Sequence, residues 1–232
     1  MSRLFAISDL HLSGSVEKPM DVFGAGWENH WEKIRQSWLD KIRDEDWVLI
    51  PGDISWAMHL EDAWVDLEEI FALPGKKVIL RGNHDYWWSA VGQLRKGLKP
   101  GAYALQNDAV GGDGWMIAGS RGWSCPGNGA LDPQDEKIYL REAQRLELSL
   151  KDAVKKRQPG DRLVAMMHFP PFNERREPSL FTDLIERYEV ETVVYGHLHG
   201  PNLRNVFEGE LGGVCYKMVS CDYVGFKVVE IK

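Results

Sequence analysis

The chain has 232 residues, and 28 Lys and Arg against 35 Asp and Glu give it a formal net charge of −7. This acidic balance argues against general nucleic-acid binding, which depends on a basic surface. Hydrophobic residues make up 44% of the sequence, enough for a sizeable core, yet no apolar run approaches the length of a membrane span. The three cysteines form no C-x-x-C pair, and the apolar run at 4–7 is too short for a secretory signal. We therefore expect reduced thiols and a cytoplasmic protein.

The first half of the chain alternates short apolar runs with amphipathic segments. The apolar runs predict buried strands at residues 4–7, 47–50 and 77–80. Apolar residues at helical spacing predict helices between them, at residues 27–43 and 60–73. Because strands that alternate with helices form right-handed crossovers, this order predicts an α/β fold with a mainly parallel inner sheet.

The alternation continues through the second half and stops only in the tail. Helices are expected at residues 87–98, 135–157 and 180–188. Strands are expected at residues 103–105, 115–119, 163–167 and 192–195. The tail carries apolar runs at 214–219 and 226–231 with no helix between them, and we expect these two strands to pair. No repeat, low-complexity tract or linker divides the chain, which predicts a single domain over residues 1–232.

Polar side chains gather where five of the predicted strands end. They are Asp9 and His11, Asp53, Asn83-His84-Asp85, His168, and His197 with His199. The carboxyl ends of strands in an open α/β sheet lie along one edge, so we expect these segments to meet in one crevice. Five of the seven histidines fall in this set, and only His30 and His59 lie elsewhere. Histidines with purely structural roles would not be distributed in this way.

The residue types in this set predict a metal site. Asp, His and an Asn amide oxygen, without a thiolate, suit a divalent ion such as Mn, Fe, Co, Ni or Zn. One ion needs fewer ligands than the set offers, whereas two ions about 3.5–4 Å apart that share a carboxylate would use them all. Such a pair lowers the pKa of a bridging water and holds a phosphoryl group.

In their order and spacing, these motifs resemble the calcineurin-like metallophosphoesterase family over residues 9–199. The resemblance implies an α/β fold, a four-layer αββα sandwich of two mixed sheets flanked by helices. The site would lie at the carboxyl ends of the inner strands, and the strand-rich tail would belong to the second sheet. It also implies a dinuclear metal-dependent phosphohydrolase that cleaves a phosphomono- or phosphodiester by attack of a metal-bridging hydroxide.

The resemblance further assigns the metal ligands, with manganese as the favoured ion. The first ion would be bound by Asp9, His11, Asp53 and His199. The second ion would be bound by Asp53, Asn83, His168 and His197. Asp53 would thus bridge the two ions.

By the same resemblance His84 is a catalytic residue and not a ligand. It would hydrogen-bond the phosphoryl oxygen or protonate the leaving group. Asp85 would orient His84 and favour its charged form, although a carboxylate here could instead cap the helix expected at 87–98. The sequence around Asp9 and His11 is more similar to that of small bacterial phosphohydrolases than to that of the protein Ser/Thr phosphatases. The protein Ser/Thr phosphatases also carry Glu at the position of Asp85.

Two residues outside these motifs are candidates for substrate binding. Arg121 follows a predicted strand and could hold a phosphate through two hydrogen bonds, or else form a salt bridge within the protein. His59 could reach the mouth of the crevice, or else merely precede the helix at 60–73.

Two other functions remain open at this stage. A nuclease would share the metal chemistry, but the acidic balance and the lack of a basic, aromatic-interleaved groove argue against it. A non-catalytic binding module is disfavoured because every expected ligand position is filled. We therefore expect a small phosphorylated substrate, no nucleic acid and no membrane, and the sequence carries no signal for an oligomeric state.

Overall fold

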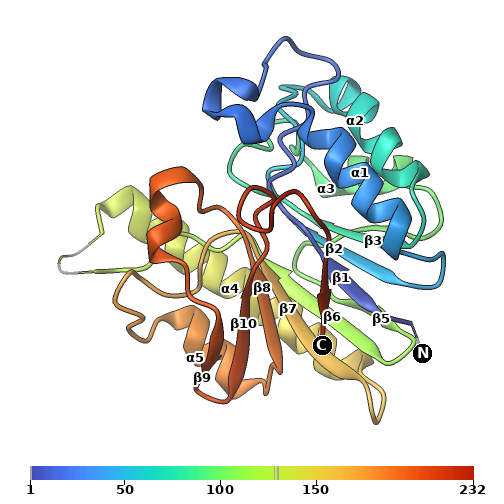
Figure 1. The fold of residues 1–232 in the computed structure, drawn as a ribbon. Coiled ribbons are helices and arrows are strands. Elements are labelled where there is room, and N and C mark those ends of the chain that lie inside the picture. The colour runs from blue at the N-terminus through green and yellow to red at the C-terminus, as the bar shows by residue number, and fades with distance from the viewer. Residues whose placement is uncertain (1, 128, 130) are drawn as a thin grey trace.

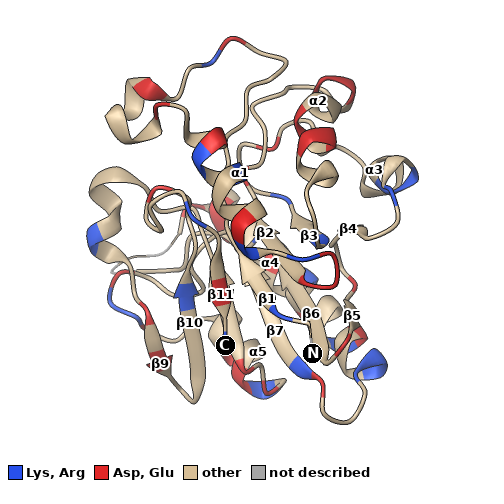
Figure 2. Cartoon of the chain, turned by 45° about the vertical axis from the view of Figure 1, so that its right-hand side comes forward, with Lys and Arg blue, Asp and Glu red and all other residues tan. Residues whose placement is uncertain are grey.

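Two mixed β-sheets lie face to face as the inner layers of the molecule, and helices cover both outer faces (Figure 1). The computed structural model describes residues 2–127, 129 and 131–232. The arrangement confirms the predicted four-layer αββα sandwich. Among the helices of these residues, none has the length and apolar character needed to cross a membrane. Basic and acidic residues are interspersed along the helices and loops (Figure 2).

The first sheet has the strand order β11-β1-β2-β3-β4. Four neighbouring strands of this sheet run parallel, namely β1 (Leu4–Ala6), β2 (Trp47–Pro51), β3 (Lys76–Leu80) and β4 (Ala102–Ala104). The last strand, β11 (Val229–Ile231), pairs antiparallel with β1, so that the two ends of the chain lie side by side.

The second sheet has the strand order β5-β6-β7-β8-β10-β9. The four inner strands are parallel, namely β6 (Trp115–Ser120), β7 (Arg162–Met167), β8 (Thr192–Tyr195) and β10 (Val214–Met218). The edge strands β5 (Val110–Gly112) and β9 (Gly209–Leu211) are antiparallel to their neighbours.

Helices fall into two groups, one on each sheet. The first sheet is covered by α1 (His30–Lys41), α2 (Leu60–Ala72) and α3 (Val91–Gly97). The second sheet is covered by α4 (Pro133–Lys156) and α5 (Leu180–Arg187). Within the described residues, three 3₁₀ segments complete the regular structure, η1 (Asp21–Phe23), η2 (Ala25–Trp27) and η3 (Gly200–Asn205).

The alternation of side chains along each strand explains the three apolar layers. In β1, Leu4 and Ala6 face the interior between the two sheets, whereas Phe5 faces the helices. Trp47 and Val164 meet Leu4 and Ala6 in the same inter-sheet cluster. Because β2, β6, β7 and β8 are buried on both faces, they read as continuous apolar runs in the sequence, whereas β10 is fully buried only at alternate residues.

The structure corrects two predictions about the tail. The strands β10 and β11 do not pair with each other, because β10 lies beside β8 in the second sheet and β11 lies beside β1 in the first. Only part of the tail therefore belongs to the second sheet. The segment between them crosses from one sheet to the other at the carboxyl edge, where the amide of Cys221 donates to the carbonyl oxygen of Ser8.

Two helices begin later than predicted. The helix expected from residue 87 begins only at Val91, because Trp87 and Trp88 lie in the loop before it and bury their side chains in the core. The helix expected from residue 27 begins at His30, since Trp27 ends a 3₁₀ segment. In both places aromatic side chains at helical spacing belong to the core without belonging to the helix.

Candidate metal centre

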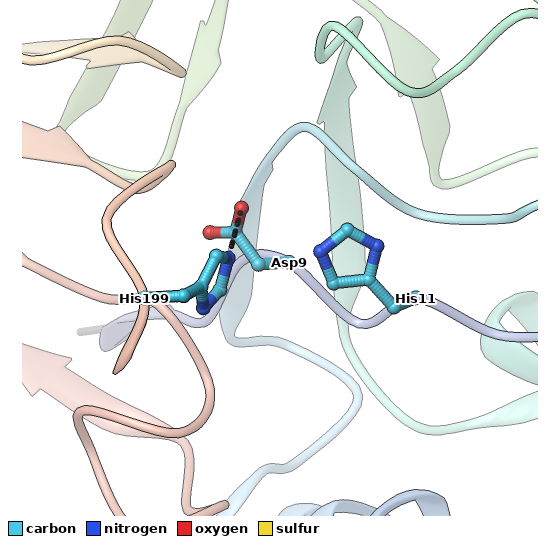
Figure 3. A group of neighbouring side chains, drawn as sticks. All are labelled: Asp9, His11 and His199. Carbon is cyan, nitrogen blue, oxygen red and sulfur yellow. Dashed lines mark ion pairs between the residues drawn. The ribbon is translucent and has the colours of Figure 1, made fainter. Parts of the chain in front are cut away.

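The loops that follow the parallel strands bring the predicted ligand residues of both sheets to one edge. Asp9 follows β1, Asp53 follows β2, Asn83 follows β3, His168 follows β7, and His197 and His199 follow β8. Two clusters whose ligand atoms lie within 4.8 Å of one another occur there, and they share Asp9. One cluster is Asp9, His11 and His199 (Figure 3), and the other is Asp9, Asp53 and His168.

The backbone at these positions is strained. Asp9, His11, Asp53 and His197 have positive φ angles of 58°, 46°, 50° and 73°. A residue other than glycine held in this region costs about 1–3 kcal/mol, and such strain concentrates at functional sites. Hydrogen bonds between the two loops hold the conformation, because the amide of Asp9 donates to Gly52 and the amide of His11 donates to Asp53, each at 3.0 Å.

Asp53 lies between the two groups of histidines. Its Oδ2 is 3.9 Å from Nε2 of His11 and 3.5 Å from Nε2 of His168. Its Oδ1 accepts a hydrogen bond from the backbone amide of His84 at 2.8 Å. One carboxylate oxygen therefore faces imidazoles from both sheets while the other fixes the loop that carries His84.

Asp9 is buried and surrounded by donors. Its Oδ1 lies 3.1 Å from Nε2 of His199, and its Oδ2 accepts hydrogen bonds from the hydroxyls of Ser8 and Ser220, the latter at 2.8 Å. The backbone amide of His197 also points at this carboxylate, 3.1 Å from Oδ2. These contacts fix the carboxylate against the loop after β8.

Asn83, His168 and His197 bring an amide oxygen and two imidazole nitrogens together. Nδ1 of His168 lies 3.0 Å from the carbonyl oxygen of Pro51, which can only accept, so Nδ1 carries the proton and Nε2 is left with a lone pair. Oδ1 of Asn83 lies 2.7 Å from that Nε2 and 3.0 Å from Nδ1 of His197. An amide oxygen and two imidazole nitrogens this close together are ligand types that suit a divalent metal ion, and these residues therefore fit one.

The electrostatics agree with this fit. Burial lowers the pKa values of His11 and His168 to about 3 and that of His197 to about 4, so these imidazoles are neutral and free to act as ligands. Burial and the negative charge of Asp9 raise the pKa of Asp53. Two crowded buried carboxylates are unfavourable without a cation between them.

His199 differs from the other three imidazoles. Burial alone would lower its pKa, but the carboxylates of Asp9 and Asp222 outweigh burial and raise the pKa to about 10. Asp222 contacts Nδ1 of His199 at 2.8 Å. Sequence reasoning missed Asp222, although it follows a strand, β10, as the other polar residues of the site do.

His84 stands next to the clusters and against the ring of Trp56. Its ring lies 4.7 Å from that of Trp56 and 5.9 Å from that of His11. Within the described residues its Nδ1 is buried without a hydrogen-bond partner. Burial, followed by the positive charge of Lys18, lowers its pKa.

Asp85 does not make the predicted contact with His84. Its buried carboxylate accepts hydrogen bonds from the backbone amides of Gly82 at 2.7 Å and Ile54 at 2.8 Å, and from the indole of Trp87 at 3.1 Å. The prediction that Asp85 orients the imidazole is therefore wrong, and so is the alternative that it caps a helix. Asp85 instead ties the loop after β2 to the loop after β3.

The two substrate-binding candidates lie at different places. The guanidinium of Arg121 is 3.4 Å from the buried carboxylate of Glu142 and stacks over Trp123. Its carbonyl oxygen accepts from the amides of His168 and Phe169, so Arg121 supports the loop of a candidate ligand. His59 is exposed and directly precedes α2, where its carbonyl oxygen accepts from Ala63. The roles of both residues toward a substrate stay predictions.

Fold and ligand clusters together define a metal-dependent phosphoesterase, and comparison with known proteins identifies its family. A family model described as calcineurin-like phosphoesterase matches residues 2–201. The chain therefore belongs to the calcineurin-like phosphoesterase family, which confirms the resemblance and the enzyme class. The family implies divalent metal ions as cofactors.

Two solved structures share the fold. A phosphopantetheinyl hydrolase from Mycobacterium tuberculosis has a TM-score of 0.58 and 14% sequence identity, over 99% of this chain and 95% of that chain. A protein of unknown function from Aquifex aeolicus has a TM-score of 0.52 and 14% identity, over 99% of this chain and 96% of that chain. At this identity the likeness concerns the fold alone. No curated protein matches the sequence.

Proposed function

We propose that the protein hydrolyses a small phosphoester with two manganese ions held at the carboxyl edge of the sandwich. The first ion would be bound by Asp9, His11, Asp53 and His199. The second ion would be bound by Asp53, Asn83, His168 and His197. The single observation that carries this proposal is the position of Asp53, whose Oδ2 lies within 3.9 Å of one imidazole from each set.

When bound, the two ions would supply an activated water and neutralise charge on the phosphoryl group. The residues of the chain would hold the ions in place and handle the proton of the leaving group. The loops after β1 and β2 hold Asp9 and Asp53 in strained conformations that keep their carboxylates pointed at the same space. The hydrogen bond from the backbone amide of His84 to Asp53 holds this residue beside the ligands. Its imidazole would hydrogen-bond a phosphoryl oxygen or donate a proton to the leaving oxygen.

We further propose that residues 1–232 form one domain. Support comes from the pairing of β11 with β1, since a strand at one end of the chain completes the sheet begun at the other. Leu4 and Val164, which belong to different sheets, also share one apolar cluster.

The proposal is tested by metal analysis and turnover on the same preparation. Protein loaded with manganese should hydrolyse p-nitrophenyl phosphate, bis(p-nitrophenyl) phosphate or both. A phosphopantetheine ester belongs in the panel because a phosphopantetheinyl hydrolase shares the fold. His84→Asn should keep its manganese and lose turnover by about 10²–10⁴-fold. A fully loaded protein that cleaves none of these esters would overturn the proposal.

A further inference from the structure

A cavity with aromatic walls opens beside the candidate metal centre. It has a volume of about 360 Å³, and its apolar walls are Met20, Phe23, Trp27 and Trp56. His84 also lines it, together with the imidazoles of His11 and His199. We call this space the aromatic cavity. None of its apolar walls was assigned a function from the sequence.

The inner wall of the aromatic cavity is built rigidly. Trp56 stacks on His11 with ring centroids 4.7 Å apart and an interplanar angle of 20°. The indole of Trp56 also donates to the sulfur of Met20 at 3.2 Å, and Nζ of Lys18 lies 3.0 Å from the ring centroid. Trp27 in turn packs edge-on against Phe226, at 5.3 Å.

The outer wall is apolar and open to water. Phe23 lines the cavity and remains 64% exposed. A large aromatic side chain at the mouth of a cavity gains free energy only when something covers it. A flat or apolar group entering the aromatic cavity would contact Phe23 and Trp56 together, and would lie next to His84.

A second cavity reaches the centre at another ligand. Its volume is about 420 Å³. His197 lines this second cavity and does not line the aromatic cavity. Phe169 is part of its lining, with its ring centroid 3.9 Å from that of His197 and an interplanar angle of 33°. The lining also offers polar groups, namely the amides of Asn202 and Asn205 and the charged side chains of Glu174 and Arg175. We call this space the amide cavity.

A phosphomonoester has one substituent and would fill only one of these two spaces. We propose that the substrate is an asymmetric phosphodiester, with an apolar or planar alcohol in the aromatic cavity and a polar substituent in the amide cavity. The proposal rests on the proposed hydrolase function. His84 borders only the aromatic cavity, so the alcohol held there is the leaving group.

The reaction balances as a simple hydrolysis. The oxygen of water forms the new bond to phosphorus, and the bond from phosphorus to the oxygen of the apolar alcohol breaks. That oxygen takes up a proton and leaves as the free alcohol. The polar substituent stays on phosphorus, and the second product is its phosphomonoester.

The direction of cleavage tests the proposal. Benzyl 2-methoxyethyl phosphate carries one planar apolar alcohol and one polar alcohol of similar acidity. With the manganese-loaded protein, phosphorus NMR should show 2-methoxyethyl phosphate as the main product. Benzyl phosphate in equal or larger amount would overturn the assignment, as would failure to cleave this diester by a protein that cleaves p-nitrophenyl phosphate. Absence of all turnover would instead be a failure of the proposed function.

Binding of a diester analogue tests the aromatic cavity without turnover. The probe is the monobenzyl ester of methylphosphonic acid, followed by tryptophan fluorescence. Phe23→Ala should weaken its binding about tenfold. Val22→Ala is the matched control, because Val22 lies on the same 3₁₀ segment, is 73% exposed and does not line the cavity. Equal affinity in Phe23→Ala and Val22→Ala would overturn the proposal.

Discussion

Asp222 and His199 form a hydrogen-bonded pair in which the carboxylate contacts Nδ1 at 2.8 Å, while Nε2 of the same imidazole lies 3.1 Å from Asp9. A carboxylate can only accept, so Nδ1 donates and Nε2 is turned toward the candidate metal centre. Partners of this kind fix the orientation of a ligating histidine and raise its basicity.

Replacing Asp222 should therefore weaken the binding of one of the two metal ions. We expect Asp222→Ala to lower manganese affinity about 10–100-fold at the site of His199, with the other site little changed. Competition with a chelator measures this. Asp183→Ala, which removes an exposed carboxylate on α5, is the control. Equal affinities in the two variants would contradict a supporting role for Asp222.

Gly82 lets the loop after β3 approach Asp53. A Cβ at this position would overlap the amide nitrogen and Oδ1 of Asp53 and lie 2.8 Å from its Cγ. Gly82→Ala should displace the carboxylate and reduce manganese content below one ion per chain. The control is Gly92→Ala in α3, where a Cβ has open space and should leave metal content unchanged. Full occupancy in Gly82→Ala would show that Asp53 tolerates the shift.

His84 and Asp85 are neighbours in sequence with separable roles. Asp85→Asn turns an amide group toward buried donors and should lower the free energy of unfolding by about 2–4 kcal/mol. His84→Asn removes a ring whose Nδ1 lacks a partner in the described residues, and should change stability by less than about 1 kcal/mol. Urea unfolding of the metal-free proteins compares them. The reverse order of stabilities would refute the structural role of Asp85.

Asp46 should make stability depend on pH. Burial alone would raise its pKa, but hydrogen bonds from Arg3 and Arg43 outweigh burial and hold the pKa below its ordinary value. The stabilisation is thus present above the ordinary carboxyl pKa and is lost as the pH falls. Asp46→Asn should be less stable by about 1–2 kcal/mol at pH 7.

That deficit should shrink as the pH falls below about 4, where the wild-type carboxylate becomes protonated. Thermal or urea unfolding of metal-free protein across this range measures it. Asp44→Asn, at an exposed position two residues earlier, should show no such trend. A deficit for Asp46→Asn that is constant with pH would contradict the prediction.

The layers of the fold and the place of the metal centre could be predicted because both follow from local patterns. Buried parallel strands read as apolar runs, and His168 directly follows such a run while Asp53 follows one after a single glycine. The pairing of β11 with β1 could not be predicted, since it joins Ile231 to Leu4 across the whole chain. Asp222 was missed for the same reason, because its strand was not recognised as one of the parallel strands that form the edge.

The different roles of adjacent residues also could not be predicted from the sequence. Asp85 follows His84 directly, but the turn after β3 directs its carboxylate to Ile54 and Gly82. The aromatic walls formed by Trp27 and Trp56 come from two separate loops and meet only in the folded chain. The sequence predicted that Trp27 belongs to a helix, because it lies at helical spacing from other apolar residues. Such spacing indicates an apolar face but does not show what that face contacts.

The central claim is a pair of metal ions bridged by Asp53, and electron paramagnetic resonance of the manganese-loaded protein tests it most directly. The wild-type chain should bind two manganese ions and give the spectrum of a magnetically coupled pair. Asp53→Asn should lose that coupling. A single ion at saturation, two isolated ions, or a coupled spectrum that survives in Asp53→Asn would contradict the claim.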